Sequence, residues 1–140
     1  MNSGGGVGAP RDKGDFEVTF AFVDVSLLKS KIHRARVTGA DENYEGSLSI
    51  SADLAELVGL EEYERILVAN LANGERFETH VIYGVRNQGV IQLNGVTAHS
   101  GKPGDRLTIM SFGQYDAEEA AIHQPKIIIL DEKNRVTEQR

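Results

Sequence analysis

The 140-residue chain contains no cysteine and only three prolines. The absence of cysteine excludes disulfide bonds, thiolate metal ligands and catalysis by a cysteine nucleophile. No apolar run approaches the roughly 20 residues that a membrane-spanning helix requires. The apolar stretch from Val18 to Leu28 is interrupted by Asp24 and lacks the pattern of a secretory signal. These absences predict a cytoplasmic protein that does not contact a membrane.

Basic residues are also scarce: 15 lysines and arginines face 21 acidic residues, for a net charge of -6. Such a chain repels a phosphate backbone unless its basic residues cluster, and here they are scattered, so nucleic acid is not an expected partner. A negative protein that binds a small dicarboxylate must concentrate positive charge in its pocket. This requirement directs attention to four cationic residues, Lys31, Arg34, Arg36 and Arg76.

The length of the chain predicts a single domain with one core. Residues 1 to about 15 are rich in glycine, and we expect residues 1–25 to form a flexible extension. Apolar residues alternate within 16–25, which would suit one extra strand there. The folded domain is predicted to occupy residues 26–140.

Short β-rich segments fill most of that domain and predict about six strands with few helical residues. Thr38 to Tyr44 is predicted to be a loop, and residues 53–59 a short helix. Asn73-Gly74 is a strong hairpin signal. Strands that leave no exposed edge favour a small closed barrel. The strand segments are centred on 30–37, 48–50, 64–71, 76–85, 90–93, 106–112 and 127–130.

The first of these strands carries several candidate site residues. A period of two places Lys31, His33, Ala35 and Val37 on one face. Ile32, Arg34 and Arg36 then belong to the other face. Lys31 and His33 are therefore predicted to point the same way.

A Gly46-Ser47 bond follows Tyr44 and Glu45. A serine hydroxyl can attack the carbonyl carbon before it, which gives an ester by an N-to-O acyl shift, and glycine offers no side chain to obstruct the attack. Loss of the serine α-proton then breaks the ester, and the resulting dehydroalanine hydrolyses to a pyruvoyl group. Alone, Gly-Ser is also an ordinary turn dipeptide, so its context decides between the two interpretations.

That context is a set of motifs in order: KSKIHRARVTGADENYEGS, NGERFETH, GVIQLNG, AH and KPGD. From about Leu27 to about Asp131 the chain resembles the pyruvoyl-dependent aspartate 1-decarboxylases. The resemblance implies a six-stranded double-psi β-barrel with short helices and a homotetramer. It also implies a pyruvoyl cofactor derived from Ser47, without pyridoxal phosphate or metal, that converts L-aspartate to β-alanine and carbon dioxide for pantothenate synthesis. It leaves open whether cleavage between 46 and 47 is spontaneous or needs a maturation factor.

The resemblance also assigns roles to residues. Ser47, His80 and Lys31 would be catalytic, with the pyruvoyl group forming a Schiff base with the substrate amine. The implied substrate-binding residues are Arg76, Lys31, His33, Gly95, Val96 and Thr97, with the arginine fork suited to a carboxylate. The implied processing residues, which would support cleavage and its oxyanion, are Tyr44, Thr79 and Asn94.

Two departures from the family pattern keep alternatives open. His80 stands where the family commonly has a tyrosine that donates a proton, and histidine can also donate at neutral pH. Val96 and Thr97 replace two small residues, which would alter the pocket. The chain could therefore act on a related acid, such as a substituted aspartate or glutamate, or be a binding subunit that is never processed. Lys31 and Arg76 could then be solvated charges, and His80 a packed residue.

Overall fold

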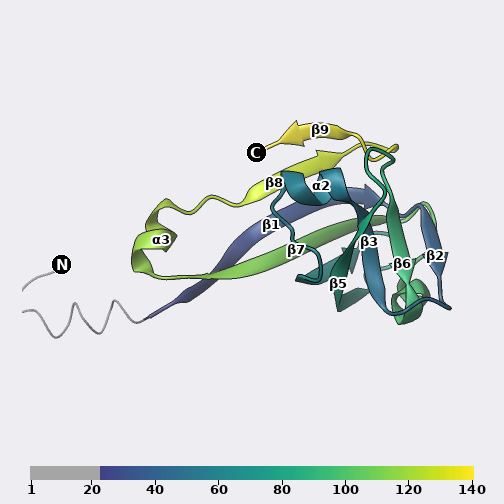
Figure 1. The fold of residues 1–140 in the computed structure, drawn as a ribbon, viewed down its shortest axis with the longest axis horizontal. Coiled ribbons are helices and arrows are strands. Elements are labelled where there is room, and N and C mark those ends of the chain that lie inside the picture. Colours follow the sequence, from purple (N-terminus) through teal and green to yellow (C-terminus); the bar gives the residue numbers. More distant parts are fainter. Residues whose placement is uncertain (1–22) are drawn as a thin grey trace, which may run out of the picture. The chain divides into compact units, whose positions relative to one another are not determined.

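The computed structural model describes residues 23–140, and this part of the chain is mainly β with short helices (Figure 1). Nine strands of this part form one sheet, in which neighbouring strands are hydrogen-bonded in the order β2-β6-β3-β5-β4-β7-β1-β8-β9. No helix in residues 23–140 is both long and apolar enough to cross a membrane. The strands are β1 (Val25–Arg36), β2 (Gly39–Asp41), β3 (Ser47–Ser51), β4 (Arg65–Asn70), β5 (Arg76–Gly84), β6 (Ile91–Asn94), β7 (Arg106–Tyr115), β8 (Lys126–Leu130) and β9 (Val136–Gln139).

Within residues 23–140, three short helices accompany the strands: α2 (Ala52–Leu57), the 3₁₀ helix η1 (Gly95–Ser100) and α3 (Ala117–Ile122). The contacts of the chain divide it into a larger unit, residues 28–112 and 125–140, and a smaller one that includes residues 113–124. In the smaller unit, α3 begins with a capping box between Asp116 and Glu119. The rings of Tyr115 and His123 lie 4.1 Å apart there.

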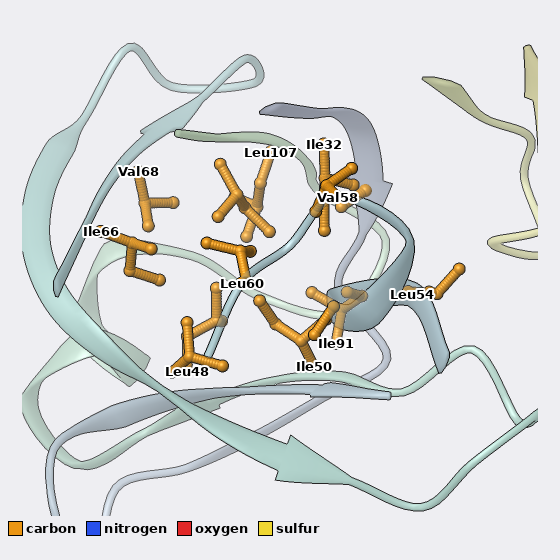
Figure 2. Close-up of a cluster of buried hydrophobic side chains, with 14 of the residues drawn as sticks. Ile32, Leu48, Ile50, Leu54, Val58, Leu60, Ile66, Val68, Ile91 and Leu107 are labelled. Carbon is orange, nitrogen blue, oxygen red and sulfur yellow. The ribbon is translucent and has the colours of Figure 1, made fainter. Parts of the chain in front are cut away.

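The core of the larger unit is aliphatic, with no exposed surface on most of its side chains. Branched residues dominate it because they pack well on pleated strands. Figure 2 shows these side chains pointing toward one another from β1, β3, β4, β6 and β7 and from the segment of α2. Those labelled are Ile32, Leu48, Ile50, Leu54, Val58, Leu60, Ile66, Val68, Ile91 and Leu107.

Strand β3 lies between β6, which is antiparallel to it, and β5, which is parallel. Its pairing with β6 sets Ser47 opposite Asn94. Its pairing with β5 sets Leu48 beside Val81. These two registers bring segments far apart in the sequence to the Gly46-Ser47 bond.

The predicted faces of the first strand are wrong beyond His33. Arg34 has a left-handed backbone with φ of 66°, which is uncommon for a residue with a side chain. The alternation reverses there, so Ala35 and Val37 are buried together with Ile32. Lys31 and His33, both half-buried, keep their alternation with Ile32.

The strands predicted after residue 25 are otherwise present, but the described part of the chain has nine strands rather than about six. β2 occupies part of the segment predicted as a loop, and β9 follows the strand that was expected to be last. The hairpin at Asn73-Gly74 is confirmed, since β4 and β5 are antiparallel and Ala69 pairs with Arg76. Most of the expected strand at 16–25 lies outside the described residues, and β1 begins only at Val25.

Asn134 ties the end of β1 to two loops. Its backbone is left-handed, with φ of 57°, and its side chain is almost wholly buried. The amide oxygen accepts from the Arg36 N–H at 2.7 Å. The amide nitrogen donates to the carbonyls of Arg36 and Gly89, each at 2.8 Å. All the hydrogen bonds of this amide group are therefore made with backbone.

Candidate active site

Ser47 is the first residue of β3, and it marks a sharp change in exposure. Residues 41–46 are exposed, whereas Ser47 keeps only 2% of its surface accessible. The Gly46-Ser47 bond thus joins a surface loop to a buried strand. The nucleophile candidate is therefore shielded from solvent, whereas the residues before it are accessible.

The Ser47 hydroxyl has two hydrogen-bond partners. Asn94 Nδ2 donates to Ser47 Oγ at 2.9 Å, in a buried contact. Ser47 Oγ in turn donates to the Glu45 carbonyl at 3.3 Å. A donor directed at the oxygen stabilises negative charge on it, so this contact favours the nucleophilic form of the hydroxyl.

Two further residues hold Asn94, and the sequence interpretation did not include them. Gln92 Nε2 donates to Asn94 Oδ1 at 2.9 Å. The Asn94 Nδ2 group also donates to Ser49 Oγ at 2.9 Å. In the sequence, Ser49 lies two residues after Ser47, and Gln92 lies two residues before Asn94. Because β3 pairs with β6, this spacing places all four side chains together.

Gly95 allows the scissile loop to approach η1. Its φ is 64°, and a Cβ atom on it would lie 2.6 Å from Gly46 N and 2.7 Å from the Tyr44 carbonyl oxygen. Real Cβ atoms do not come so close to backbone, so any side chain here would displace the loop. Tyr44 itself is 56% exposed, and its backbone rather than its ring makes this approach.

Thr97 directs its hydroxyl at the backbone. Its Oγ1 lies 2.8 Å from the Asn94 carbonyl oxygen and 3.2 Å from that of Ser47, and it donates toward both. Val96 is 75% exposed. Its Cγ1 would be 3.9 Å from a Cβ on Gly46, so its side chain lies beside the scissile bond.

Thr79 and His80 lie on β5, next to β3. Because Leu48 pairs with Val81 in a parallel register, Ser47 and His80 occupy the preceding positions of the two strands. His80 is half-buried, and its ring centre is 6.5 Å from that of Tyr63. Arg76 begins β5 and is exposed.

Lys31 and His33 lie on β1, which β5, β4 and β7 separate from β3 in the strand order. His33 Nδ1 and Thr108 Oγ1 are 3.0 Å apart and share a hydrogen bond. Burial is the main cause that lowers the pKa of His33, followed by nearby positive charges on Lys31, Arg34, Arg106 and Arg140. His33 is thus biased toward neutral imidazole in a locally cationic region.

The predicted site residues therefore fall into one connected cluster and two sets outside it. Tyr44, Gly46, Ser47, Asn94, Gly95, Val96 and Thr97 form one cluster, which hydrogen bonds and close contacts connect. Arg76, Thr79 and His80 lie on the neighbouring strand β5, with Arg76 at its start, whereas Lys31 and His33 lie on β1, further across the sheet. Within residues 23–140, no three histidine or acidic side chains are arranged to hold a metal.

The chain is mainly β, and the buried Ser47 hydroxyl, which accepts from Asn94, follows a glycine whose carbonyl a serine nucleophile could attack, as in a self-cleaving enzyme. The model of one family, aspartate decarboxylase, matches residues 23–137. The chain belongs to this family.

Named relatives agree with that assignment. Aspartate 1-decarboxylase of Shouchella clausii is 49% identical over 113 residues, which cover 81% of this chain and 89% of the relative. The enzyme of the same name from Lactiplantibacillus plantarum is 47% identical, over 81% of this chain and 87% of its own. That of Bordetella avium is 45% identical, over 81% and 93%.

Proposed function

We propose that this chain is a self-processing, pyruvoyl-dependent aspartate 1-decarboxylase that converts L-aspartate to β-alanine and carbon dioxide for pantothenate synthesis. Family membership supports the reaction. The observation that carries the self-processing is the 2.9 Å hydrogen bond from Asn94 to the buried Ser47 hydroxyl. This hydrogen bond holds the Ser47 hydroxyl, which directly follows the Gly46 carbonyl in the chain, and Gly46 has no side chain to obstruct the attack.

Cleavage begins when Ser47 Oγ attacks the Gly46 carbonyl carbon and its proton passes to the Ser47 nitrogen as the peptide C–N bond breaks. An ester then links Gly46 to Ser47 Oγ. Removal of the Ser47 α-proton expels the Gly46 carboxylate and leaves dehydroalanine. Hydrolysis of dehydroalanine releases ammonia and gives the ketone. Asn94 favours the first step because its N–H stabilises charge on the attacking oxygen.

The residues present fit a pyruvoyl group at position 47. The residue is buried, its carbonyl oxygen is within reach of the Thr97 hydroxyl at 3.2 Å, and Gly95 presents no side chain to the preceding Gly46. When formed, the group supplies an electron-withdrawing carbonyl that accepts the electron pair left by departing carbon dioxide. The Thr97 hydroxyl would donate to the backbone carbonyl of residue 47, next to the new ketone.

The remaining roles belong to charged and titratable side chains. In this proposal Arg76 grips a substrate carboxylate, and Lys31 adds a fixed cation. His33 hydrogen-bonds as a neutral imidazole, which agrees with its lowered pKa. His80 delivers the proton that replaces carbon dioxide, from the strand beside Ser47.

The proposal extends to assembly and location. The strands of residues 26–140 would close as a six-stranded double-psi barrel, with β2, β9 and the ends of longer strands as additions. Residues 1–25 would be an extension to it. A cytoplasmic homotetramer would bring side chains of neighbouring copies together, and the side chains of Arg76 and Val96 are exposed enough to meet another copy.

Denaturing mass spectrometry of the purified protein tests this function. We expect two fragments, residues 1–46 and 47–140, with the second lacking an N-terminal amine. Ser47→Ala should remain whole and release no carbon dioxide from aspartate, because it has no nucleophile. A wild-type protein that stays whole yet decarboxylates aspartate would refute the cofactor, and a whole, inactive one would favour a binding subunit.

A second substrate remains a candidate because of two observations. Val96 projects beside the scissile bond, and His80 occupies the neighbouring strand position. Carbon dioxide release from aspartate, glutamate and 3-substituted aspartates should be compared at equal concentration. Greater kcat/KM for one of the other acids than for aspartate would replace the proposed substrate but leave the mechanism. Thr97 carries less weight here, since its hydroxyl is directed at backbone oxygens.

A further inference from the structure

Four polar side chains form a row where β3 and β6 pair. Ser47 lies opposite Asn94, and Ser49 lies opposite Gln92. Residues two apart on a strand share a face, so both serines and both amides project to the same side. Proposed self-cleavage uses one of these four residues as nucleophile, which raises the question of what the other three do.

Both N–H groups and the oxygen of the Asn94 amide are hydrogen-bonded. Its two N–H groups donate to Ser47 Oγ and Ser49 Oγ, each at 2.9 Å. Its oxygen accepts from Gln92 Nε2 at 2.9 Å. If this amide were turned over, its NH₂ group would face the NH₂ group of Gln92, and two donors would oppose each other. With the Gln92 nitrogen directed at Asn94, the favoured orientation of the Asn94 amide is the one that turns its own nitrogen toward Ser47.

The orientation matters for the nucleophile. An N–H directed at Ser47 Oγ stabilises the oxygen as it loses its proton. The reversed amide would present a carbonyl oxygen, which accepts the hydroxyl proton and disfavours negative charge on Oγ. The two orientations therefore have opposite effects on the attack at Gly46.

We propose that Gln92 and Ser49 are positioning residues for self-cleavage: Gln92 fixes the Asn94 amide with its nitrogen toward Ser47, and Ser49 satisfies the second N–H of that nitrogen. This inference rests on the proposed function, since it concerns the same bond. Gly39 leaves room for Gln92, because a Cβ there would lie 3.2 Å from Gln92 Oε1. Neither residue touches the atoms that react.

The test is a time course of cleavage at pH 7.5 after cell-free synthesis. Denaturing mass spectrometry measures the fraction of cut chain at each time. Gln92→Leu removes the donor while keeping a side chain of similar size, and we expect cleavage about tenfold slower than in the wild type. Gln92→Glu presents a carboxylate, which accepts only and favours the reversed Asn94 amide. We expect it to slow cleavage about 100-fold.

The pH dependence of cleavage in Gln92→Glu distinguishes positioning of the Asn94 amide from a purely structural role of Gln92. Below about pH 5 the introduced carboxyl gains a proton and can again donate to Asn94 Oδ1. The ratio of the Gln92→Glu rate to the wild-type rate should therefore rise at least about fivefold between pH 7.5 and pH 5. Gln88→Glu is the matched control, since Gln88 is exposed between β5 and β6, and its ratio should stay flat.

Ser49 is tested with a pair of variants. Ser49→Ala leaves one Asn94 N–H without its acceptor, and we expect cleavage about threefold slower. Ser49→Thr retains the hydroxyl and should restore the rate. Wild-type cleavage together with unchanged rates in both Gln92 variants would overturn this inference alone. A wild type that is never cleaved would instead overturn the proposed function.

Discussion

Two buried asparagines in this chain have the same side chain and opposite surroundings. Asn134 bonds only to backbone, at Arg36 and Gly89. Asn94 bonds through its amide group only to other side chains. The first connects segments of chain that are distant in sequence, whereas the second controls a hydroxyl group.

The difference teaches how one functional group serves two purposes. An amide held by backbone is oriented by the path of the chain, so no single neighbouring side chain can turn it. An amide held by side chains takes its orientation from residues that can be replaced one at a time. We therefore expect substitutions around Asn94 to change the rate of cleavage, and substitutions at Asn134 to change stability.

We expect the largest effect from Gly95→Ala, which alters the backbone next to Asn94 but removes none of the hydrogen bonds of its side chain. Gly95→Ala places a Cβ against the backbone of Tyr44 and Gly46 and must move the scissile loop. Displacing reacting groups by about 1 Å can cost about 100-fold in rate, so we expect cleavage slower by at least that factor. The fraction of cut chain, followed by denaturing mass spectrometry, measures it.

Gly74→Ala is the matched control for that substitution. Gly74 is also left-handed, with φ of 78°, but a Cβ there meets nothing within 4 Å. It should cost about 1 kcal/mol of stability through backbone strain and leave cleavage unchanged. Equal cleavage rates in the two variants would contradict the role given to the close approach at Gly95.

The next effect sharpens the other side of the comparison. Asn134→Ala deprives the Arg36 N–H and two carbonyls of their partner, and we expect the free energy of unfolding to fall by about 2–3 kcal/mol. Urea unfolding should be measured in the Ser47→Ala background, where the chain stays whole. Cleavage in the otherwise wild-type chain should continue at its normal rate.

Asn87→Ala separates the hydrogen bonds from the backbone strain. Asn87 has a left-handed φ of 63° like Asn134, but it is exposed. The extra loss of unfolding free energy in Asn134→Ala, compared with Asn87→Ala, measures the contribution of the buried amide hydrogen bonds. If both substitutions cost the same, the backbone contacts of Asn134 would contribute nothing measurable.

The smallest expected effect concerns His33, a polar contact outside both asparagine regions. Its pKa is lowered in the folded state, mainly by burial. Between the folded pKa and the ordinary value near 6.5, the unfolded chain binds more protons. Stability should therefore fall as pH drops below about 6.5 and stop responding to His33 below its folded pKa.

His33→Gln removes that proton-linked part of the pH dependence. Comparing urea unfolding at pH 7.5 and pH 5.5, again with Ser47→Ala, should show a smaller loss in the variant than in its parent. The same loss in both would mean that His33 binds protons equally in the folded and unfolded chain. An NMR titration of the imidazole below 6.5 would support the predicted direction.

Much of the candidate site could be predicted from local sequence. Ser47, Asn94 and Gly95 lie in short motifs shared with the family that the chain resembles, and the resemblance drew attention to them without a fold. Gln92 and Ser49 were missed because their roles depend on the register between β3 and β6, which no single segment encodes. Pairing the Ser-x-Ser and Gln-x-Asn patterns as neighbouring strands would have found them.

The fold was predictable where burial imposes a period on the sequence. The strands around Leu48 and Val68 were recognised because alternate residues are apolar and buried. The faces beyond Arg34 were wrong because a left-handed arginine interrupts the alternation, and no sequence pattern marks it. β9 was missed because all its residues are exposed, so neither face selects for apolar residues.

The pairing of β1 with β8 and of β2 with β6 has a lasting consequence for a molecule cut after Gly46. Both early strands then belong to one polypeptide and their partners β6, β7 and β8 to the other, so the native sheet is a complex of two fragments. Refolding of the intact precursor is a unimolecular reaction, whereas reassembly of the fragments requires an encounter and slows on dilution. After maturation, the folded structure would therefore re-form more slowly from its separated fragments than the precursor does from one chain.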